Sequence, residues 1–302
     1  MKIGMSLSTP TDIPILKPRK AWPFQCRVNR LTGIESETPR VSVIIPSFNQ
    51  ADYLEAAIRS VLCQDYPNVE CLVLDGGSKD GSAEIIEHYR SALAYARSHS
   101  DNGQSAAVNE GAQRATGDIM SFLNSDDMLA QGAISRIVKT FAQHPESMLV
   151  HGERILIDAS DNVAGWSHSI PFNPDETPYN INSETAFWKS QAFDELGGFN
   201  ESLSFALDLD FFCRIYAKYP IHLINQFLGY YRFHPLSKSE TMDDVRLVES
   251  RECWRDIFGT DYPEAPQAPR SLITRIRHAA RGIIHPRVLL APYLNFKFLK
   301  RR

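Results

Sequence analysis

Residues 41–75, VSVIIPSFNQADYLEAAIRSVLCQDYPNVECLVLD, decide the fold of this 302-residue chain. The run VSVIIP (41–46) is short, continuous, rich in β-branched residues and ended by a proline, which is typical of a buried strand. A helix follows, because apolar residues recur at helical spacing at Leu54, Ala57, Ile58, Val61 and Leu62. VECLVLD (69–75) predicts a second buried strand, so the segment forms a strand–helix–strand unit.

The same alternation continues to about residue 143. After the glycine-rich turn GGSKDGS (76–82), further elements are predicted at 83–93 (helix), 104–116 (helix), 118–124 (strand) and 130–143 (helix). Buried strands that alternate with helices favour an α/β fold, with a mostly parallel central sheet and helices on both faces.

The composition is that of a globular protein. With 43% hydrophobic and 23% charged residues, it excludes disordered and fibrous chains. No run of 18 apolar residues occurs and the N-terminus lacks a continuous apolar segment, so we expect neither a transmembrane helix nor secretion. The five cysteines are scattered without a CxxC pair, which argues against a disulfide framework and a structural zinc site. We therefore expect a cytoplasmic protein.

Charge is distributed unevenly along the chain. Residues 265–302 contain nine of the 32 Lys and Arg residues and no Asp or Glu, which leaves an acidic body. An acidic body argues against nucleic-acid binding. One face of a predicted tail helix is apolar and the other is basic, the apolar residues being Leu272, Ile273, Ile276, Ala279, Ala280, Ile283 and Ile284. The tail is therefore either an interfacial membrane anchor or a helix docked on the acidic body.

Polar residues follow three of the predicted strands where each strand ends, at Pro46-Ser47, Asp75-Gly76-Gly77 and Asn124–Asp127. Ligands of open α/β sheets bind beyond the carboxyl ends of the strands, so we expect one site there. Asp75 can accept hydrogen bonds from a base or ribose, whereas Asp80 is expected to cap the next helix. The turn contains neither GxGxxG nor GxxxxGK[ST], which argues against a dinucleotide-binding or P-loop protein.

Two adjacent carboxylates, Asp126 and Asp127, can hold Mg²⁺ or Mn²⁺, because these ions prefer oxygen ligands and suit a nucleotide diphosphate. The alternative is that the pair caps the helix that follows. In the segment YRFHPLSKS (231–239), Arg232 and Lys238 are candidate phosphate partners and His234 is a candidate metal ligand. A structural histidine is the alternative there.

A third acidic cluster opens the predicted helix in ALDLDFFCR (206–214). Asp208 and Asp210 cannot share one helical face, so we expect different roles. Asp210 can pair with Arg214 at i+4, whereas Asp208 can point into a cleft and act as a base. The alternative is that both only complement the helix dipole.

Together these segments resemble family 2 glycosyltransferases, inverting enzymes with the nucleotide-sugar-binding fold called GT-A. The resemblance runs from about Val41 to Ser239. It is carried by the order and spacing of four stretches, VSVIIPSFNQADYLEAAIRSVLCQDYPNVECLVLDGGSKDGS, SDNGQSAAVNEGAQRATGDIMSFLNSDD, FWKSQAFDELGGFNESLSFALDLDFFCR and YRFHPLSKS.

The resemblance implies roles for individual residues. It assigns to the nucleotide pocket Pro46, Ser47, Asp75, Asp101, Asn109 and Ser125. Asp126 matches the metal-binding last aspartate of the family's DxD motif, and Asp208 matches the general base. His234 and Lys238 match the loop that closes on metal and diphosphate.

The chain departs from the family pattern at two motifs. Asn124 occupies the first DxD position, so a ribose contact usually made by a carboxylate would come from an amide or elsewhere. Asp127 follows Asp126 at once, which leaves open which carboxylate ligates the metal. Leu207-Asp208 stands where the family often has Glu-Asp, and the base itself is in place.

The resemblance implies an inverting glycosyltransferase that uses Mn²⁺ or Mg²⁺ and a nucleotide-sugar donor, which we expect to be UDP-linked. The acceptor would be a hydroxyl of a glycan or lipid-linked sugar in surface polysaccharide synthesis. Aromatic residues between 165 and 206 are candidates for acceptor stacking or for the core, namely Trp166, Phe172, Tyr179, Phe187 and Trp188. The rival class is a non-catalytic nucleotide-sugar- or glycan-binding module with a degenerate site, which Asn124 favours.

These assignments divide the chain into three parts. Residues 1–40, with five of the 18 prolines, are expected to form an N-terminal extension packed on the surface. Residues 41–255 form the GT-A domain, with nucleotide-sugar binding in 41–128 and the acceptor side and base in 129–255. Residues 256–302 form the basic amphipathic tail, through which a peripheral position on the cytoplasmic face of the membrane is expected if the anchor interpretation holds.

Overall fold

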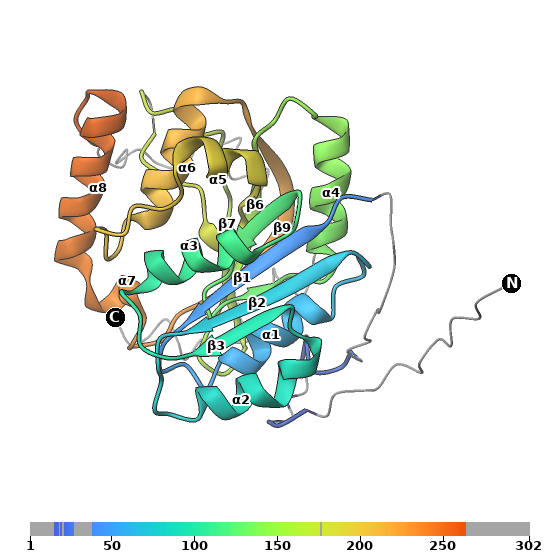
Figure 1. The fold of residues 1–302 in the computed structure, drawn as a ribbon. Coiled ribbons are helices and arrows are strands. Elements are labelled where there is room, and N and C mark those ends of the chain that lie inside the picture. The colour runs from blue at the N-terminus through green and yellow to red at the C-terminus, as the bar shows by residue number, and fades with distance from the viewer. Residues whose placement is uncertain (1–14, 18, 20, 27–37, 176, 264–302) are drawn as a thin grey trace, which may run out of the picture.

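The structure is a computed structural model that describes residues 15–17, 19, 21–26, 38–175 and 177–263. Within these residues, nine strands form one curved sheet in the order β3-β2-β1-β4-β8-β6-β9-β5, with β7 paired to β6. Helices cover both faces of the sheet (Figure 1). The expected α/β architecture is confirmed, although residues 264–302 of the predicted tail (256–302) lie outside the described residues.

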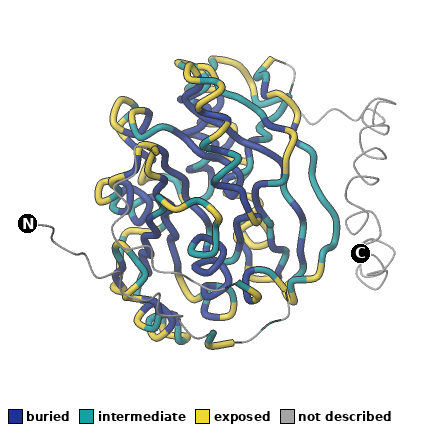
Figure 2. The backbone as a smooth tube through the Cα atoms, turned by 90° about the vertical axis from the view of Figure 1, so that its right-hand side faces the viewer, coloured by how far each residue is buried: buried dark blue, intermediate teal, exposed yellow. Residues whose placement is uncertain are grey.

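The first four strands are parallel, and the sequence predicts three of them, β1, β2 and β4, but not β3. β1 (Val41–Ser47) lies between β2 (Val69–Asp75) and β4 (Ile119–Phe122), and β3 (Tyr95–Ser98) borders β2. All seven residues of β1 are buried, which explains why apolar residues are adjacent at positions 43–45 instead of alternating with polar ones. Figure 2 shows the buried strands as the dark-blue interior of the molecule.

Alternate residues of each strand pack against different helices. On one face lie α1 (Leu54–Leu62), α2 (Ser82–Tyr89) with the short η1 (Arg90–Ala92), and α4 (Ala133–Gln143). On the other lie α3 (Gln104–Arg114), α5 (Ser190–Leu196), α6 (Leu207–Lys218) and α8 (Asp243–Phe258). A Cβ at Gly111 would come within 2.5 Å of Ile44, so glycine at this position lets α3 approach β1 closely.

The second half of the sheet is mixed, which the sequence does not predict. Here lie β5 (Met128–Leu129), β6 (Leu149–Ile157), β7 (Val163–Ser167), β8 (Phe187–Lys189) and β9 (Ile221–Arg232). β8 runs antiparallel to both β4 and β6, whereas β6 and β9 are parallel. The short η2 (Ser183–Thr185) precedes β8, and α7 (Lys238–Thr241) follows β9. This arrangement brings the end of β9 beside the end of β4.

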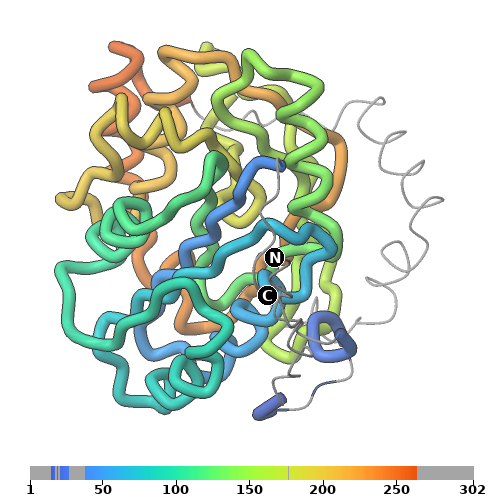
Figure 3. Tube along the Cα trace, turned by 45° about the vertical axis from the view of Figure 1, so that its right-hand side comes forward, coloured from blue at the N-terminus to red at the C-terminus, as the bar shows by residue number. Residues whose placement is uncertain are grey.

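The described part of the N-terminal extension packs against α1 (Figure 3). The buried carboxylate of Glu55 accepts the backbone N–H groups of Leu16 and Lys17, at 2.7 and 2.9 Å. Cys26 forms a disulfide with Cys63, the residue that directly follows α1. The expectation of unpaired cysteines was wrong for this pair, because the fold returns the extension to α1 across 37 residues of sequence.

The other described cysteines, Cys71, Cys213 and Cys253, are buried and unpaired. No helix among the described residues combines the length and the apolarity that crossing a bilayer requires.

Trp188 lies at the centre of the second core face and has no exposed surface. Its ring centroid lies 5.8 Å from that of Phe199 and 5.5 Å from that of Phe211. The sequence leaves open whether Trp188 stacks on an acceptor sugar or belongs to the core, and the structure places both Trp188 and Phe187 in the core.

We predict that Trp188→Ala lowers the free energy of unfolding by about 3–5 kcal/mol, because it removes a large buried ring and leaves a cavity. Urea unfolding followed by far-UV circular dichroism measures this change. The matched control is Val248→Ala on the exposed side of α8, which should change the free energy by no more than about 0.5 kcal/mol. Equal losses in the two variants would contradict the assignment of Trp188 to the core.

Candidate active site

A cavity of about 740 Å³ opens beyond the carboxyl ends of β1 and β4, which is where the parallel sheet predicts a ligand site. Eight of the residues predicted to form the site line this cavity, namely Pro46, Ser47, Asp101, Ser125, Asp126, Asp127, Asp208 and Lys238. Its wall also contains parts of η2 and of the segment before α7. Four predicted residues are not part of the wall, namely Asp75, Asn109, Arg232 and His234.

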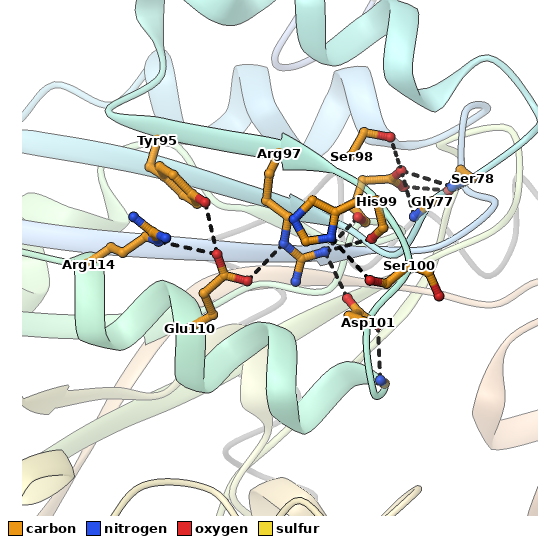
Figure 4. A network of polar contacts seen from close by, with 12 residues as sticks. Gly77, Ser78, Tyr95, Arg97, Ser98, His99, Ser100, Asp101, Glu110 and Arg114 are labelled. Carbon is orange, nitrogen blue, oxygen red and sulfur yellow. Dashed lines mark hydrogen bonds and ion pairs between the residues drawn. The ribbon is translucent and has the colours of Figure 1, made fainter.

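Asp75 is fully buried and organises the turn that follows β2. Its carboxylate accepts hydrogen bonds from the N–H of Gly77 and from the N–H and hydroxyl of Ser78. It also accepts one from the Ser98 hydroxyl on β3, at 2.6 Å (Figure 4). The turn and β3 thus donate to both oxygens of Asp75, and its contact with a base or ribose stays a prediction.

Asp101 lies at the cavity wall and is held there by Arg97, which is almost completely buried. Arg97 bonds to Asp101 and to Glu110, each at 2.9 Å, and to the carbonyl of Asp75 (Figure 4). The N–H of Gly103 donates to the other Asp101 oxygen at 2.9 Å. The carboxylate is therefore preorganised at the surface of the cavity.

The side chain of Asn109 holds α3 against the loop before α6 and does not line the cavity. Its Nδ2 donates to the carbonyl of Phe199 and to Glu201, each at 2.9 Å, and its Oδ1 accepts the N–H of Phe199 at 2.8 Å. These three hydrogen bonds direct the amide toward the loop before α6, and the nucleotide contact expected of Asn109 stays a prediction.

Asp126 and Asp127 have different surroundings. Oδ2 of Asp126 lies 2.9 Å from Nε2 of His234, a buried ring packed against Tyr53. Asp127 is almost completely buried, and its Oδ1 accepts the backbone N–H of Arg232 at 2.9 Å. Burial and the charge of Asp126 raise the pKa of Asp127 well above its ordinary value. Asp126 is therefore the better placed of the two to meet a ligand, and His234 contacts Asp126 instead of the cavity.

The side chain of Arg232 has no exposed surface. Its Nε donates to the carbonyl of Asp126 at 2.7 Å, and its Nη1 donates to the carbonyl of Asp158 and to Oδ1 of Asp161, at 3.1 and 2.6 Å. Oδ2 of Asp161 in turn accepts Nη1 of Arg19, in the N-terminal extension, at 2.6 Å. The guanidinium is buried at the end of β9 and bonds to the backbone at Asp126, and the diphosphate contact expected of Arg232 stays a prediction.

Asp208 lines the cavity from the first turn of α6. Burial raises the pKa of its carboxyl to about 6, while the N–H of Leu209, 2.8 Å from Oδ1, limits the rise. The neighbouring Asp210 forms the predicted ion pair with Arg214, at 2.6 Å, and turns away from Asp208. The predicted pair of Asp210 with Arg214 is confirmed, whereas the role of Asp208 as a base stays a prediction.

Lys238 lines the cavity and lies in the segment that follows β9. Its Nζ donates to Oε1 of Gln104 at 2.6 Å and to the carbonyl of Ser204 at 2.9 Å. Nε2 of Gln104 donates to Oδ1 of Asn124 at 2.7 Å, so the amide at the first position of the predicted metal motif is tied to α3. The lysine ammonium thus lies at the mouth of the site within reach of an anionic ligand.

A family model described as glycosyl transferase family 2 matches residues 42–203, more than half of the chain. The chain belongs to this family. The matched range includes the ends of β1 and β4, Asp101 and Asp126. Asp208 and Lys238 lie beyond it, and the structure brings them into the same cavity.

Curated proteins that are similar to this chain are named as glycosyltransferases. An uncharacterized glycosyltransferase of Rickettsia conorii is 30% identical over 214 residues, which cover 64% of this chain and 34% of that protein. The PGL/p-HBAD biosynthesis glycosyltransferase of Mycobacterium bovis is 28% identical over 183 residues, which cover 59% of this chain and 70% of that protein. This family 2 chain therefore matches about a third of the length of its Rickettsia conorii and Rickettsia felis relatives.

Solved glycosyltransferase structures share the fold. S. aureus TarS 1-349 in complex with UDP-GlcNAc superposes with a TM-score of 0.56 at 17% identity, covering 87% of this chain and 76% of that one. Mannosyltransferase PcManGT from Pyrobaculum calidifontis, in complex with GDP-Man and Mn2+, superposes with a TM-score of 0.59 at 21% identity, covering 85% and 74%. This likeness confirms the GT-A fold expected for the family 2 chain.

The residues at the cavity fit a divalent cation that is shared with a substrate. Among the described residues, no group of three or more His, Cys, Asp and Glu side chains could hold a metal ion. Mg²⁺ in such sites commonly takes one or two carboxylates and completes its shell with water and substrate phosphates. Asp126 is suited to this arrangement because its carboxylate lines the cavity across from the Lys238 segment.

Several cavity residues escaped the sequence analysis, among them Arg154 and Glu184. They lie on β6 and on η2, and neither belongs to a motif with recognisable spacing. Of the aromatic candidates for acceptor stacking, Tyr179 is the one that lines the cavity. Only the mixed half of the sheet brings these side chains together.

We predict that Asp161→Ala lowers the free energy of unfolding by about 3–5 kcal/mol, because it removes a carboxylate that pairs with the buried guanidinium of Arg232. Urea unfolding measures the loss. Asp261→Ala is the control, since it removes the exposed partner of Arg255 and should cost less than about 1 kcal/mol. Similar values for both variants would show that the Arg232 contact is not a stabilising constraint.

Proposed function

We propose that this protein is an inverting glycosyltransferase that moves a sugar from a nucleotide-diphosphate donor to a hydroxyl of an acceptor. The observation that carries the proposal is that one cavity holds Asp126, suited to a divalent metal, together with Asp208, whose pKa of about 6 suits a base. Family membership supports the same reaction class.

The donor half of the cavity is formed by Pro46, Ser47, Asp101 and Ser125, which we assign to the nucleotide. Solved structures of the same fold carry UDP, UDP-GlcNAc or GDP-Man, which supports a nucleotide-sugar donor. A UDP-sugar is the donor we expect for this chain.

The proposed reaction is a single displacement. Asp208 takes the proton from the acceptor hydroxyl as the oxygen attacks the anomeric carbon from the face opposite the diphosphate. Lys238 offsets negative charge at the mouth of the cavity, and Asp126 would hold a divalent metal, Mn²⁺ or Mg²⁺. When bound, such an ion neutralises charge that develops on the leaving diphosphate. A positioned base contributes about 10²–10⁴-fold to the rate.

We propose a glycan or lipid-linked sugar as the acceptor, within surface polysaccharide synthesis. The support is the Mycobacterium bovis relative, whose name places it in PGL/p-HBAD biosynthesis. The basic, amphipathic sequence of residues 265–302 is compatible with a peripheral position on the cytoplasmic face of a membrane. A non-catalytic binding module is the second candidate, and Asn124 in place of a carboxylate favours it.

We predict that one of UDP, GDP, dTDP or CMP binds to the protein in the presence of Mn²⁺ and binds at least tenfold more weakly without it. Isothermal titration calorimetry measures the four dissociation constants. Asp126→Ala should remove the Mn²⁺ dependence, because the carboxylate that faces the cavity is lost. Asp194→Ala, an exposed position on α5, is the control and should bind as the unaltered protein does.

The remaining outcomes discriminate between the candidates. Retained Mn²⁺ dependence in Asp126→Ala, with its loss in Asp127→Asn, would assign the metal to Asp127. Failure of all four nucleotides to bind to a folded protein would contradict a nucleotide-sugar enzyme.

We predict that release of nucleoside diphosphate from the donor falls about tenfold per pH unit as the pH drops below about 6. The sign follows from the raised pKa, because Asp208 is protonated below it and cannot accept the proton of the acceptor. Initial rates between pH 4.5 and 8 at saturating donor test this dependence.

Asp208→Asn tests the same role at fixed pH. It should lower the rate by about 10²–10⁴-fold and leave the nucleotide dissociation constant unchanged. The exposed Asp243→Asn on α8 is the control. An unchanged rate in Asp208→Asn would exclude this residue as the base.

A further inference from the structure

An ion pair in the cavity wall has no role in the scheme above. Glu184, on η2, is 1% exposed, and its Oε1 lies 3.5 Å from Nη1 of Arg154 on β6. Both residues line the cavity. A carboxylate with so little exposed surface is unusual unless its polar atoms are satisfied.

The polar atoms of this pair are not all satisfied by the protein. Among the described residues, Oε1 of Glu184 accepts no hydrogen bond and Nε of Arg154 donates none. Buried polar groups without partners are rare in folded proteins, and in a cavity wall they indicate where a ligand supplies the missing bonds. The pair offers both an acceptor and a donor in adjacent positions.

The pair is held rigidly in place. A Cβ at Gly229 would lie 2.6 Å from the carbonyl oxygen of Glu184, so β9 approaches η2 closely at this glycine. Next to it, the Thr185 hydroxyl donates to the carbonyl of Gly152 at 3.2 Å. The guanidinium of Arg154 lies 4.5 Å from the ring centroid of Tyr231. Such fixed groups bind with little loss of side-chain freedom.

The charge of Glu184 acts on the proposed base. Burial is the main cause of the raised pKa of Asp208, and the charge of Glu184 raises it further. Glu184 also lines the same cavity as Asp208 and as Asp126, the carboxylate proposed for the metal.

In a single displacement, the transferred sugar lies between the leaving diphosphate and the base. We propose that Glu184 and Arg154 bind hydroxyl groups of that transferred sugar ring and thereby select the donor sugar. This inference rests on the proposed function, because it presupposes a nucleotide-sugar donor in the cavity. A sugar hydroxyl both donates and accepts, so a carboxylate beside a guanidinium satisfies it fully.

The charged residues that line the cavity indicate which class of transferred sugar it can bind. Five carboxyl residues line it, namely Asp101, Asp126, Asp127, Glu184 and Asp208, and the lysine and arginine residues in the wall are Arg154 and Lys238. Glu184 already engages Arg154, so a uronic acid would meet an unfavourable field at this point. The geometry points to an uncharged hexose or N-acetylhexosamine.

Calorimetry with Glu184→Gln tests the proposal in the presence of Mn²⁺. The probes are UDP and GDP, and the sugar forms UDP-glucose, UDP-N-acetylglucosamine, GDP-mannose and UDP-glucuronate. We expect an uncharged sugar form to bind roughly tenfold to hundredfold more weakly to the variant, because a charge-assisted hydrogen bond is lost. Binding of the parent diphosphate should stay unchanged, and UDP-glucuronate should bind to the unaltered protein more weakly than UDP-glucose.

Two further variants make the experiment decisive. Arg154→Gln removes the other half of the pair and should give the same selective loss, which covers the case in which Glu184→Gln does not fold. Glu87→Gln, exposed on α2, is the matched control and should change neither dissociation constant.

Each way in which the proposal can fail gives a different calorimetric result. Unchanged binding of every sugar form in both variants, with diphosphate binding intact, would overturn the assignment of the pair alone. Equal weakening of diphosphate and sugar forms would show that the pair acts on the nucleotide and would overturn it as well. Failure of UDP, GDP, dTDP and CMP alike to bind to the folded, unaltered protein would instead overturn the proposed function and the inference together.

Discussion

The guanidinium of Arg232 joins the three chain segments on which the candidate site depends. It bonds to the backbone at Asp126 after β4, to the turn after β6 at Asp158 and Asp161, and through Asp161 to Arg19 of the N-terminal extension. A buried charge is tolerated only when it is paired and hydrogen-bonded, so these segments must assemble around it together. The position of Asp126, the carboxylate for which we propose metal binding, therefore depends on an arginine that does not line the cavity.

The chemistry of the cavity follows from carboxyl groups that the fold removes from water. Burial raises the pKa of Asp208 into the range in which a carboxylate acts as a base near neutral pH. Burial also raises the pKa of Asp127, whose Oδ1 accepts the backbone N–H of Arg232. Adjacent residues of similar type thus acquire different properties from their surroundings, and Asp126, which faces the cavity, is left for a cation.

The sequence predicts residue types at the site better than it predicts their orientation. Asp75 and Asn109 occupy positions that match the family pattern, yet a turn and a loop take up their hydrogen bonds. Arg232 ends a strand whose other residues alternate in direction, and a shift of one position would have faced it outward. Such outcomes depend on partners from distant segments, which no local pattern encodes.

The sequence by itself determined β1, β2 and β4 of the parallel half of the sheet, the helices that pack on them and the placement of polar residues at their ends, because these follow from local runs and periodicity of apolar residues. It did not predict the short strand β3. It also determined the separation of Asp208 from Asp210, which is a property of helical geometry. Only the tertiary structure decided the mixed order of β8, β6 and β9, the disulfide of Cys26 with Cys63, and the presence of Glu184 and Arg154 in the cavity wall. These features arise from contacts between segments far apart in sequence, whose formation depends on the packing of the whole chain.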